Sequence, residues 1–181
     1  MNDIKQLTVS DRLKDGTRII IRAIRPDDKD KIIEAFNNLE PESVYTRFFC
    51  YKSHLTDDDL KWTTEVDFER DIQLVVTINK NGREIIIAGS RLSMLSTAPD
   101  APKQAEVAFT VEEDFHGQGI ASRLLQQLIK IAKEKKVSYL EAEVLSRNKA
   151  MMAVFNKSGL PVKVQIDGRT RIVTMALNEK G

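Results

Sequence analysis

Apolar positions along the chain fall into short runs separated by polar turns. Some runs are dense or alternate with a period of two, which predicts β-strands. The predicted strands cover residues 17–24, 72–78, 84–95, 103–111, 138–145, 162–166 and 171–177. Asn81-Gly82 and Asp167-Gly168 are dipeptides typical of tight hairpin turns, so each predicts a turn between two neighbouring strands.

Other runs repeat with helical spacing. They predict helices that start at Pro26, at Pro41 and after an N-terminal cap at Thr56, with two more at residues 118–136 and 148–157. In the 118–136 helix the apolar face consists of Ala121, Leu124, Leu125, Leu128, Ile129 and Ala132. Strands and helices in this order predict an α/β domain of the α+β type rather than a series of regular βαβ units. Trp62 is expected in the core.

Length and composition restrict the class of protein. The 181 residues predict one domain over residues 1–181, with residues 1–16 as a polar N-terminal extension. A net charge of +1 gives no reason to expect nucleic acid or a membrane surface as partner. The single cysteine excludes an intrachain disulfide, and no metal is expected. The absence of a signal-type or membrane-spanning apolar run favours a cytoplasmic location.

The segment 105–132 carries the most chemical information. It combines an apolar strand, a loop with Gly117 and Gly119, and an amphipathic helix. Backbone N–H groups at such a helix start can bind a phosphate or pyrophosphate. Ile120 and Ala121 stand where a Walker loop needs Lys and Ser or Thr, and the loop has two glycines where a dinucleotide fingerprint needs three.

The loop His116-Gly117-Gln118-Gly119-Ile120-Ala121 resembles the acetyl-CoA loop of the GNAT N-acetyltransferases, with His116 in place of the usual Gln or Arg. Residues 148–159 resemble the family's second signature, and RAIRPDD and PESVYTRFF resemble the bacterial Pat-type protein lysine acetyltransferases. The resemblance implies a GNAT fold, a mixed, mostly antiparallel twisted sheet flanked by helices, and acetyl-CoA as co-substrate. It implies these cofactor contacts: Phe109, Thr110, Val111, His116, Gly117, Gln118, Gly119, Ile120, Ala121, Ser122, Asn148 and Phe155.

The implied reaction is direct attack of an amine on the thioester, with Glu106 as general base. Glu106 lies in the strand before the loop, where a surface role is the alternative. Asn148 would contact the cofactor, cap its helix, or do both. Phe155 stands where many family members have a proton-donating Tyr, so CoA would leave as a thiolate or be protonated by water. Glu112, Glu113 and Asp114 are expected to form a solvated run of charges.

The sequence does not identify the acceptor of the acetyl group. The leading hypothesis is a protein lysine, with a small amine such as an amino acid or polyamine as alternative. A non-catalytic acyl-CoA-binding regulatory module is a further possibility, and a homodimer is conceivable by analogy of fold. Tyr45, Arg47 and His54 are candidates for selecting the acceptor, although a structural role is more common for a single His. The acyl chain preferred and any regulator are not predicted.

Overall fold

The computed structural model describes residues 3–48, 52–95 and 98–177, with side chains for all of these except residues 45–48. The chain divides into two compact units. Unit 1 comprises Met1–Arg91 and Phe109–Ile120, and unit 2 comprises Leu92–Ala108 and Ala121–Gly181.

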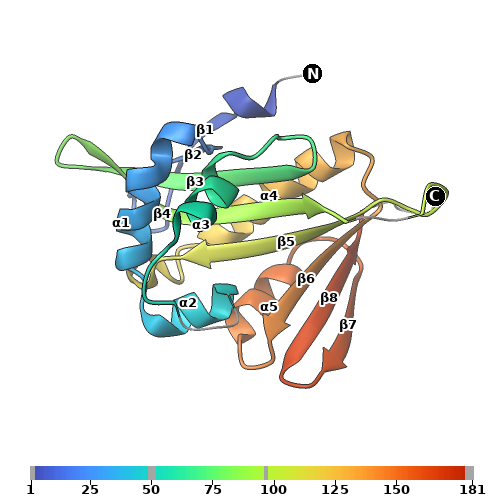
Figure 1. The fold of residues 1–181 in the computed structure, drawn as a ribbon. Coiled ribbons are helices and arrows are strands. Elements are labelled where there is room, and N and C mark those ends of the chain that lie inside the picture. The colour runs from blue at the N-terminus through green and yellow to red at the C-terminus, as the bar shows by residue number, and fades with distance from the viewer. Residues whose placement is uncertain (1–2, 49–51, 96–97, 178–181) are drawn as a thin grey trace. The chain divides into compact units, whose positions relative to one another are not determined.

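Hydrogen bonds join eight strands of the described residues in the order β1-β2-β3-β4-β5-β6-β8-β7 (Figure 1). The strands are β1 (Thr8–Arg12), β2 (Arg18–Ala23), β3 (Asp71–Lys80), β4 (Arg83–Met94), β5 (Gln104–Val111), β6 (Tyr139–Leu145), β7 (Val162–Asp167) and β8 (Thr170–Ala176). The β5–β6 pair is parallel, whereas β1–β2, β2–β3, β6–β8 and β7–β8 are antiparallel. The predicted mixed, mostly antiparallel sheet is confirmed.

Strand β1 was not predicted, because residues 1–16 were expected to be a polar extension. It pairs with β2 from Thr8↔Arg22 to Arg12↔Arg18. Four of its five residues are exposed, so its sequence TVSDR lacks the alternation that marks a half-buried strand. Its position at the edge of the sheet depends on pairing with β2 rather than on burial.

The described residues of unit 1 form three α-helices: α1 (Lys29–Asn37), α2 (Pro41–Phe48) and α3 (Asp57–Thr64). Thr56 caps α3 as predicted, since its hydroxyl accepts a hydrogen bond from the backbone N–H of Asp59 at 3.1 Å. In Figure 1, α1 and α3 lie on one face of β3 and β4. Buried apolar residues from these strands, such as Leu74, Val76 and Ile87, form much of the core of unit 1.

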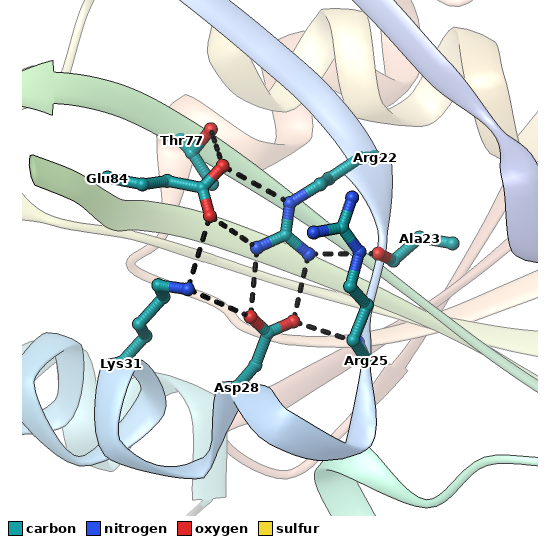
Figure 2. Close-up of polar contacts among 7 residues, drawn as sticks. All are labelled: Arg22, Ala23, Arg25, Asp28, Lys31, Thr77 and Glu84. Atoms are coloured by element: carbon teal, nitrogen blue, oxygen red, sulfur yellow. Dashed lines mark hydrogen bonds and ion pairs between the residues drawn. The ribbon is translucent and has the colours of Figure 1, made fainter.

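A buried ion-pair network connects elements of unit 1 (Figure 2). The guanidinium of Arg22 donates to both carboxylate oxygens of Asp28, at 2.8 and 2.9 Å, and to Glu84 at 2.9 Å. Lys31 lies 3.3 Å from the Glu84 carboxylate and 3.6 Å from that of Asp28. Since Arg22 belongs to β2, Glu84 to β4 and Asp28 to the short 3₁₀ helix Pro26–Asp28, the network connects the start of α1 to two strands.

Burial alone would raise the pKa of Asp28, but hydrogen bonds from Arg22 and from the backbone N–H of Arg25 outweigh it. The pKa of this carboxyl is therefore lower than usual. The pKa of Glu84 is also lowered, first by the hydrogen bond from Arg22. Both groups stay ionised at neutral pH, which a buried arginine requires.

In the part of unit 2 that the structure describes there are two helices, α4 (Ile120–Glu134), whose first residue belongs to unit 1, and α5 (Lys149–Asn156). The predicted apolar face of α4 is buried at Leu124, Leu125, Leu128, Ile129 and Ala132. The helix begins two residues later than predicted, because Gly119 has φ = +83° and lies outside the α-helical region. The turn of the β7–β8 hairpin was predicted at Asp167-Gly168, but Asp167 is the last residue of β7 and pairs with Thr170, so the turn consists of Gly168 and Arg169.

Candidate active site

Glu106 lies in the first half of β5. Its neighbours Ala105 and Val107 are buried, whereas Glu106 itself is exposed, so the strand directs its carboxylate away from the core. In the parallel ladder with β6, Glu106 is the register partner of Glu141. Register partners are neighbours on one face, so unit 2 brings two carboxylates to adjacent strands. The sequence alone does not indicate that Glu141 is next to Glu106.

The second half of β5 differs in its pairing. Over the described residues, the ladder with β6 comprises three pairs and ends at Glu106↔Glu141, although β5 continues to Val111. The backbone N–H of Glu112, just after β5, donates to the carbonyl of Ile87 in β4 at 2.9 Å. Residues 107–111 therefore lie outside the β6 ladder. The predicted contacts Phe109, Thr110 and Val111 are all in this part of the strand.

The loop after β5 has the backbone that the glycines predict. Gly117 and Gly119 have φ values of +76° and +83°, in a region that residues with a Cβ rarely adopt. A Cβ added at Gly117 would meet nothing within 4 Å, so the loop is open at that point. His116 donates from Nε2 to the carbonyl of Val111 at 2.9 Å in the tautomer that has hydrogen there. This contact closes the loop onto the end of β5.

The loop leads directly into α4, whose first turn contains Ile120, Ala121 and Ser122. The first N–H groups of an α-helix have no partner within the helix, and they carry the positive end of its dipole. Gln118 and Gly119 precede this turn. The backbone is therefore suited to an anionic group such as a pyrophosphate.

Two predicted cofactor contacts are associated with α5, one at its N-cap and one within the helix. Asn148 caps the helix, because its side-chain oxygen accepts a hydrogen bond from the backbone N–H of Met151 at 3.2 Å. The capping alternative for Asn148 is therefore confirmed. Phe155 is fully buried. A contact of either residue with a cofactor stays a prediction.

The expected solvated run of acidic residues is wrong for two of its three members. Glu112 and Glu113 are partly buried, and only Asp114 is exposed. Glu113 accepts a hydrogen bond from the backbone N–H of Glu40 at 3.2 Å. Burial raises the pKa of Glu112, and the negative charges of Asp114 and Glu113 raise it further. The local sequence EEDF does not indicate these tertiary contacts.

Trp62 was expected in the core, but it is 49% exposed. The guanidinium of Arg91 lies 3.5 Å from the centre of the Trp62 ring, which is a cation–π contact. Arg91 also donates to the carbonyl of Trp62 at 2.8 Å and pairs with Asp71 at 3.3 Å. In the sequence, a helix tryptophan whose ring packs against a charged side chain cannot be told apart from a tryptophan buried in the core.

His54 is exposed, and its Nδ1 lies 3.1 Å from the hydroxyl of Ser53. The side chains of Tyr45 and Arg47 are outside the described residues. Within residues 3–48, 52–95 and 98–177, no group of three or more His, Cys, Asp or Glu could hold a metal ion. No helix in this part of the chain is long and apolar enough to cross a bilayer.

Comparisons with known proteins identify the family and the fold of the chain. The model of the acetyltransferase (GNAT) domain family matches residues 18–161. The acetyltransferase Pat of Mycolicibacterium smegmatis is 30% identical over 148 residues, which are 82% of this chain and 43% of that protein. The crystal structure of the GNAT domain of Streptomyces lividans PAT has a TM-score of 0.83 and 29% identity, covering 93% of this chain and 96% of that one.

A third similar structure is yncA from Salmonella typhimurium, described as a putative acetyltransferase with its cofactor acetyl-CoA. Its TM-score is 0.68 at 19% identity, with 89% of this chain and 95% of that one covered, so the likeness concerns the fold. The family match covers most of the chain, and the chain therefore belongs to the GNAT acetyltransferase family. The predictions of the GNAT fold and of an acetyl-CoA-dependent N-acetyltransferase are confirmed at the level of the family.

Proposed function

We propose that this chain transfers the acetyl group of acetyl-CoA to a primary amine, preferably a protein lysine, with Glu106 as general base. The observation that carries the proposal is the strand, glycine loop and helix of residues 104–134 in a chain of the GNAT family. The similarity to Pat-type acetyltransferases supports a protein lysine as acceptor. The chain spans 43% of the Mycolicibacterium protein, so the activity of that whole protein does not transfer directly.

The residues of the loop fit the phosphate part of acetyl-CoA. Gly117 and Gly119 have positive φ, and Gly117 leaves open space where a side chain would start. The N–H groups at the start of α4 would bind the pyrophosphate, with Gln118 and Ser122 beside them. Residues 109–111, outside the β6 ladder, would pair through their backbone with the pantetheine amides as an added strand would.

A lysine amine has a pKa of about 10.4, so at neutral pH most of it carries a proton and cannot attack. The Glu106 carboxylate would take that proton, directly or through one water. Acetyl-CoA supplies the activated thioester carbonyl. A backbone N–H near Val111 would stabilise the charge that develops on its oxygen. A new C–N bond replaces the C–S bond, and the amide nitrogen loses its second proton to water. Phe155 cannot donate a proton, so CoA would leave as a thiolate or take its proton from water, since thiols have a pKa of about 8.5.

The test combines binding and turnover. Calorimetric titration with acetyl-CoA measures binding, and thiol release with a lysine-rich protein measures transfer. We expect Glu106→Gln to retain acetyl-CoA affinity and to lower kcat by about 10²- to 10⁴-fold. Glu143→Gln, an exposed glutamate of β6, is the matched control and should behave as the wild type.

Each result decides a separate part of the proposal. Unchanged kcat in Glu106→Gln would show that another group is the base. Acetyl-CoA binding without thiol release from any lysine or small amine would favour a non-catalytic acyl-CoA-binding module. Absence of acetyl-CoA binding would contradict the role of the glycine loop. A cytoplasmic location and a homodimer stay predictions.

A further inference from the structure

Unit 1 contains a cavity of about 110 Å³ under α1 and α3. Its apolar walls come from α1, β3, β4 and the segment before α3, and they include Ile32, Phe36, Leu39, Leu55, Val75 and Ile86. A cavity of roughly 150 Å³ in another protein accepts benzene, so by proportion this one has room for about four or five heavy atoms. The walls favour a hydrocarbon chain of that size.

Two buried polar residues also line this cavity. Gln73, from β3, is 7% exposed and Ser90, from β4, is 2% exposed. The side-chain oxygen Gln73 Oε1 has no hydrogen-bond partner. Ser90 lies between Gly89 and Arg91, which face Gln73 and Trp62, so its hydroxyl is on the opposite face of β4. The Gln73 amide lies over β4, where its Nε2 is 3.2 Å from the position that a Cβ on Gly89 would occupy. Since a buried acceptor without a partner is unfavourable, a ligand that brings a donor gains affinity here.

The charges around the cavity define which donor fits. Among its described lining residues, the charged groups are Asp59, Arg91 and Glu112. Arg91 is engaged by Asp71 and by the carbonyl and ring of Trp62, so an anion would find no cation available to pair with it. Asp59 pairs with Lys52 at 3.1 Å, which leaves the carboxyl of Glu112 as the group that a cation would balance.

We infer that this cavity binds an aliphatic primary ammonium group on a chain of about four carbons. The hydrocarbon chain packs against the apolar walls, and the ammonium donates to Gln73 Oε1. Nothing in this binding requires acetyl transfer. That the bound amine is the acetyl acceptor rests on the proposed function, and the alternative is an amine effector.

Trp62 is the only tryptophan of the chain and lines the cavity, so its fluorescence reports on occupancy. The probe is n-butylamine, compared with n-butanol and n-butyrate, which keep the chain and change the charge. We expect a saturable change with n-butylamine, at least about ten-fold weaker binding of n-butanol, and no binding of n-butyrate. Equal affinity for n-butanol, or no response to n-butylamine, would overturn the inference.

Two variants test the named atom and the cavity. Gln73→Leu replaces an unpartnered buried acceptor by an apolar side chain of similar size, so the protein should fold and bind n-butylamine about ten-fold more weakly. Ala35→Leu on α1 fills the cavity and should abolish binding. Gln165→Leu on the exposed strand β7 is the control and should bind as the wild type. Unchanged affinity in Gln73→Leu would contradict the inference even if Ala35→Leu fails to fold.

Acetyl-transfer kinetics distinguish the two sources of the amine. If n-butylamine is acetylated, or competes with a lysine peptide for acetylation, it occupies the acceptor position. If it changes the rate of acetyl transfer without competing with the peptide, it is an effector. Because fluorescence titration needs no acetyl-CoA, failure of the proposed function would leave the n-butylamine result intact. Conversely, acetyl transfer that proceeds normally while Trp62 does not respond would remove this inference alone.

Discussion

At the scale of single residues, Arg22 and Asp28 are the most deeply buried ion pair among the described residues, at 2% and 0% exposure of their side chains. Burying two charges costs free energy that their attraction and hydrogen bonds must offset. Asp28 accepts from Arg22 through both oxygens and also from the backbone N–H of Arg25. The pair therefore orients the start of α1 relative to β2, and removal of one partner leaves a buried charge.

Asp28→Asn should lower the free energy of unfolding by about 1.5–3 kcal/mol, because Arg22 loses the charge of its buried partner and keeps only the partly exposed carboxylate of Glu84. Urea denaturation followed by circular dichroism measures the loss. The control is Glu65→Gln, which removes the exposed ion pair between Lys29 and Glu65 and should cost less than about 1 kcal/mol. A loss of similar size in the two variants would show that burial does not determine the contribution of the pair.

At the scale of elements, α5 is a short helix of eight residues, so its first turn depends strongly on the cap. The Asn148 side chain accepts from Met151 N–H at 3.2 Å, which satisfies one of the four N–H groups left without partners at the helix start. The same side chain is a predicted cofactor contact. Capping and cofactor binding can be separated by choosing substitutions that keep one and change the other.

Asn148→Ala should lower the free energy of unfolding by about 0.5–2 kcal/mol, whereas Asn148→Asp keeps a capping oxygen and should remain within a few tenths of the wild type. Thermal unfolding measures both. Calorimetric titration with acetyl-CoA then tests the predicted cofactor contact. A carboxylate near the cofactor phosphates would weaken acetyl-CoA binding in Asn148→Asp without loss of stability. Equal acetyl-CoA affinity in all three proteins would restrict Asn148 to capping.

The elements that could be predicted from the sequence are those with a local signal. Asn81-Gly82 and Asp167-Gly168 mark turns because their backbone geometry suits them to hairpins, and the apolar face of α4 repeats with helical period. Strand β1 has no such signal, since its exposed residues are ordered by pairing with β2. The start of α4 was misplaced by two residues because Gly119 lies in the left-handed region.

For the candidate site, the sequence indicated residues that share one stretch of chain, Glu106 and the loop from His116 to Ser122, and their roles stay predictions. The sequence did not indicate contacts made by distant segments. The neighbouring position of Glu141 follows from strand register, and the burial of Glu112 follows from tertiary packing. Gln73 did carry a signal, because it is a polar residue between the apolar Ile72 and Leu74 of β3. A buried polar residue at such a position marks either a paired group or a ligand contact.

At the scale of the whole molecule, the net charge is +1, so long-range attraction or repulsion contributes little near neutral pH. Stability then depends on local electrostatics. Several carboxyls have a lowered pKa: Asp28, Asp59, Asp67 and Glu84. Backbone hydrogen bonds dominate for Asp67, which accepts from three N–H groups, and for Asp59, which accepts from Thr56. Glu112 is the opposite case, since burial raises its pKa.

These shifts determine how stability depends on pH. A carboxyl whose folded pKa is depressed contributes stability that is present above its unfolded pKa of about 4 and is lost as pH falls through the folded value. Glu112 has the opposite sign and gains stability as pH falls below its raised pKa. With several lowered groups against one raised group, the free energy of unfolding should be nearly level above pH 5 and fall below pH 4, by about 1.4 kcal/mol per pH unit for each proton taken up on unfolding.

Urea titrations at several pH values between 7 and 3 measure this dependence. Asp28→Asn removes one of the lowered groups, so its curve should start lower at pH 7 and fall less steeply below pH 4 than the wild type. Glu65→Gln should start near the wild-type value and keep the wild-type slope, because that glutamate is exposed in its ion pair. Parallel curves for Asp28→Asn and the wild type would mean that Asp28 has a similar pKa in the folded and unfolded states. The contribution of Asp28 would then come from hydrogen bonding and packing at every pH, rather than from its ionisation.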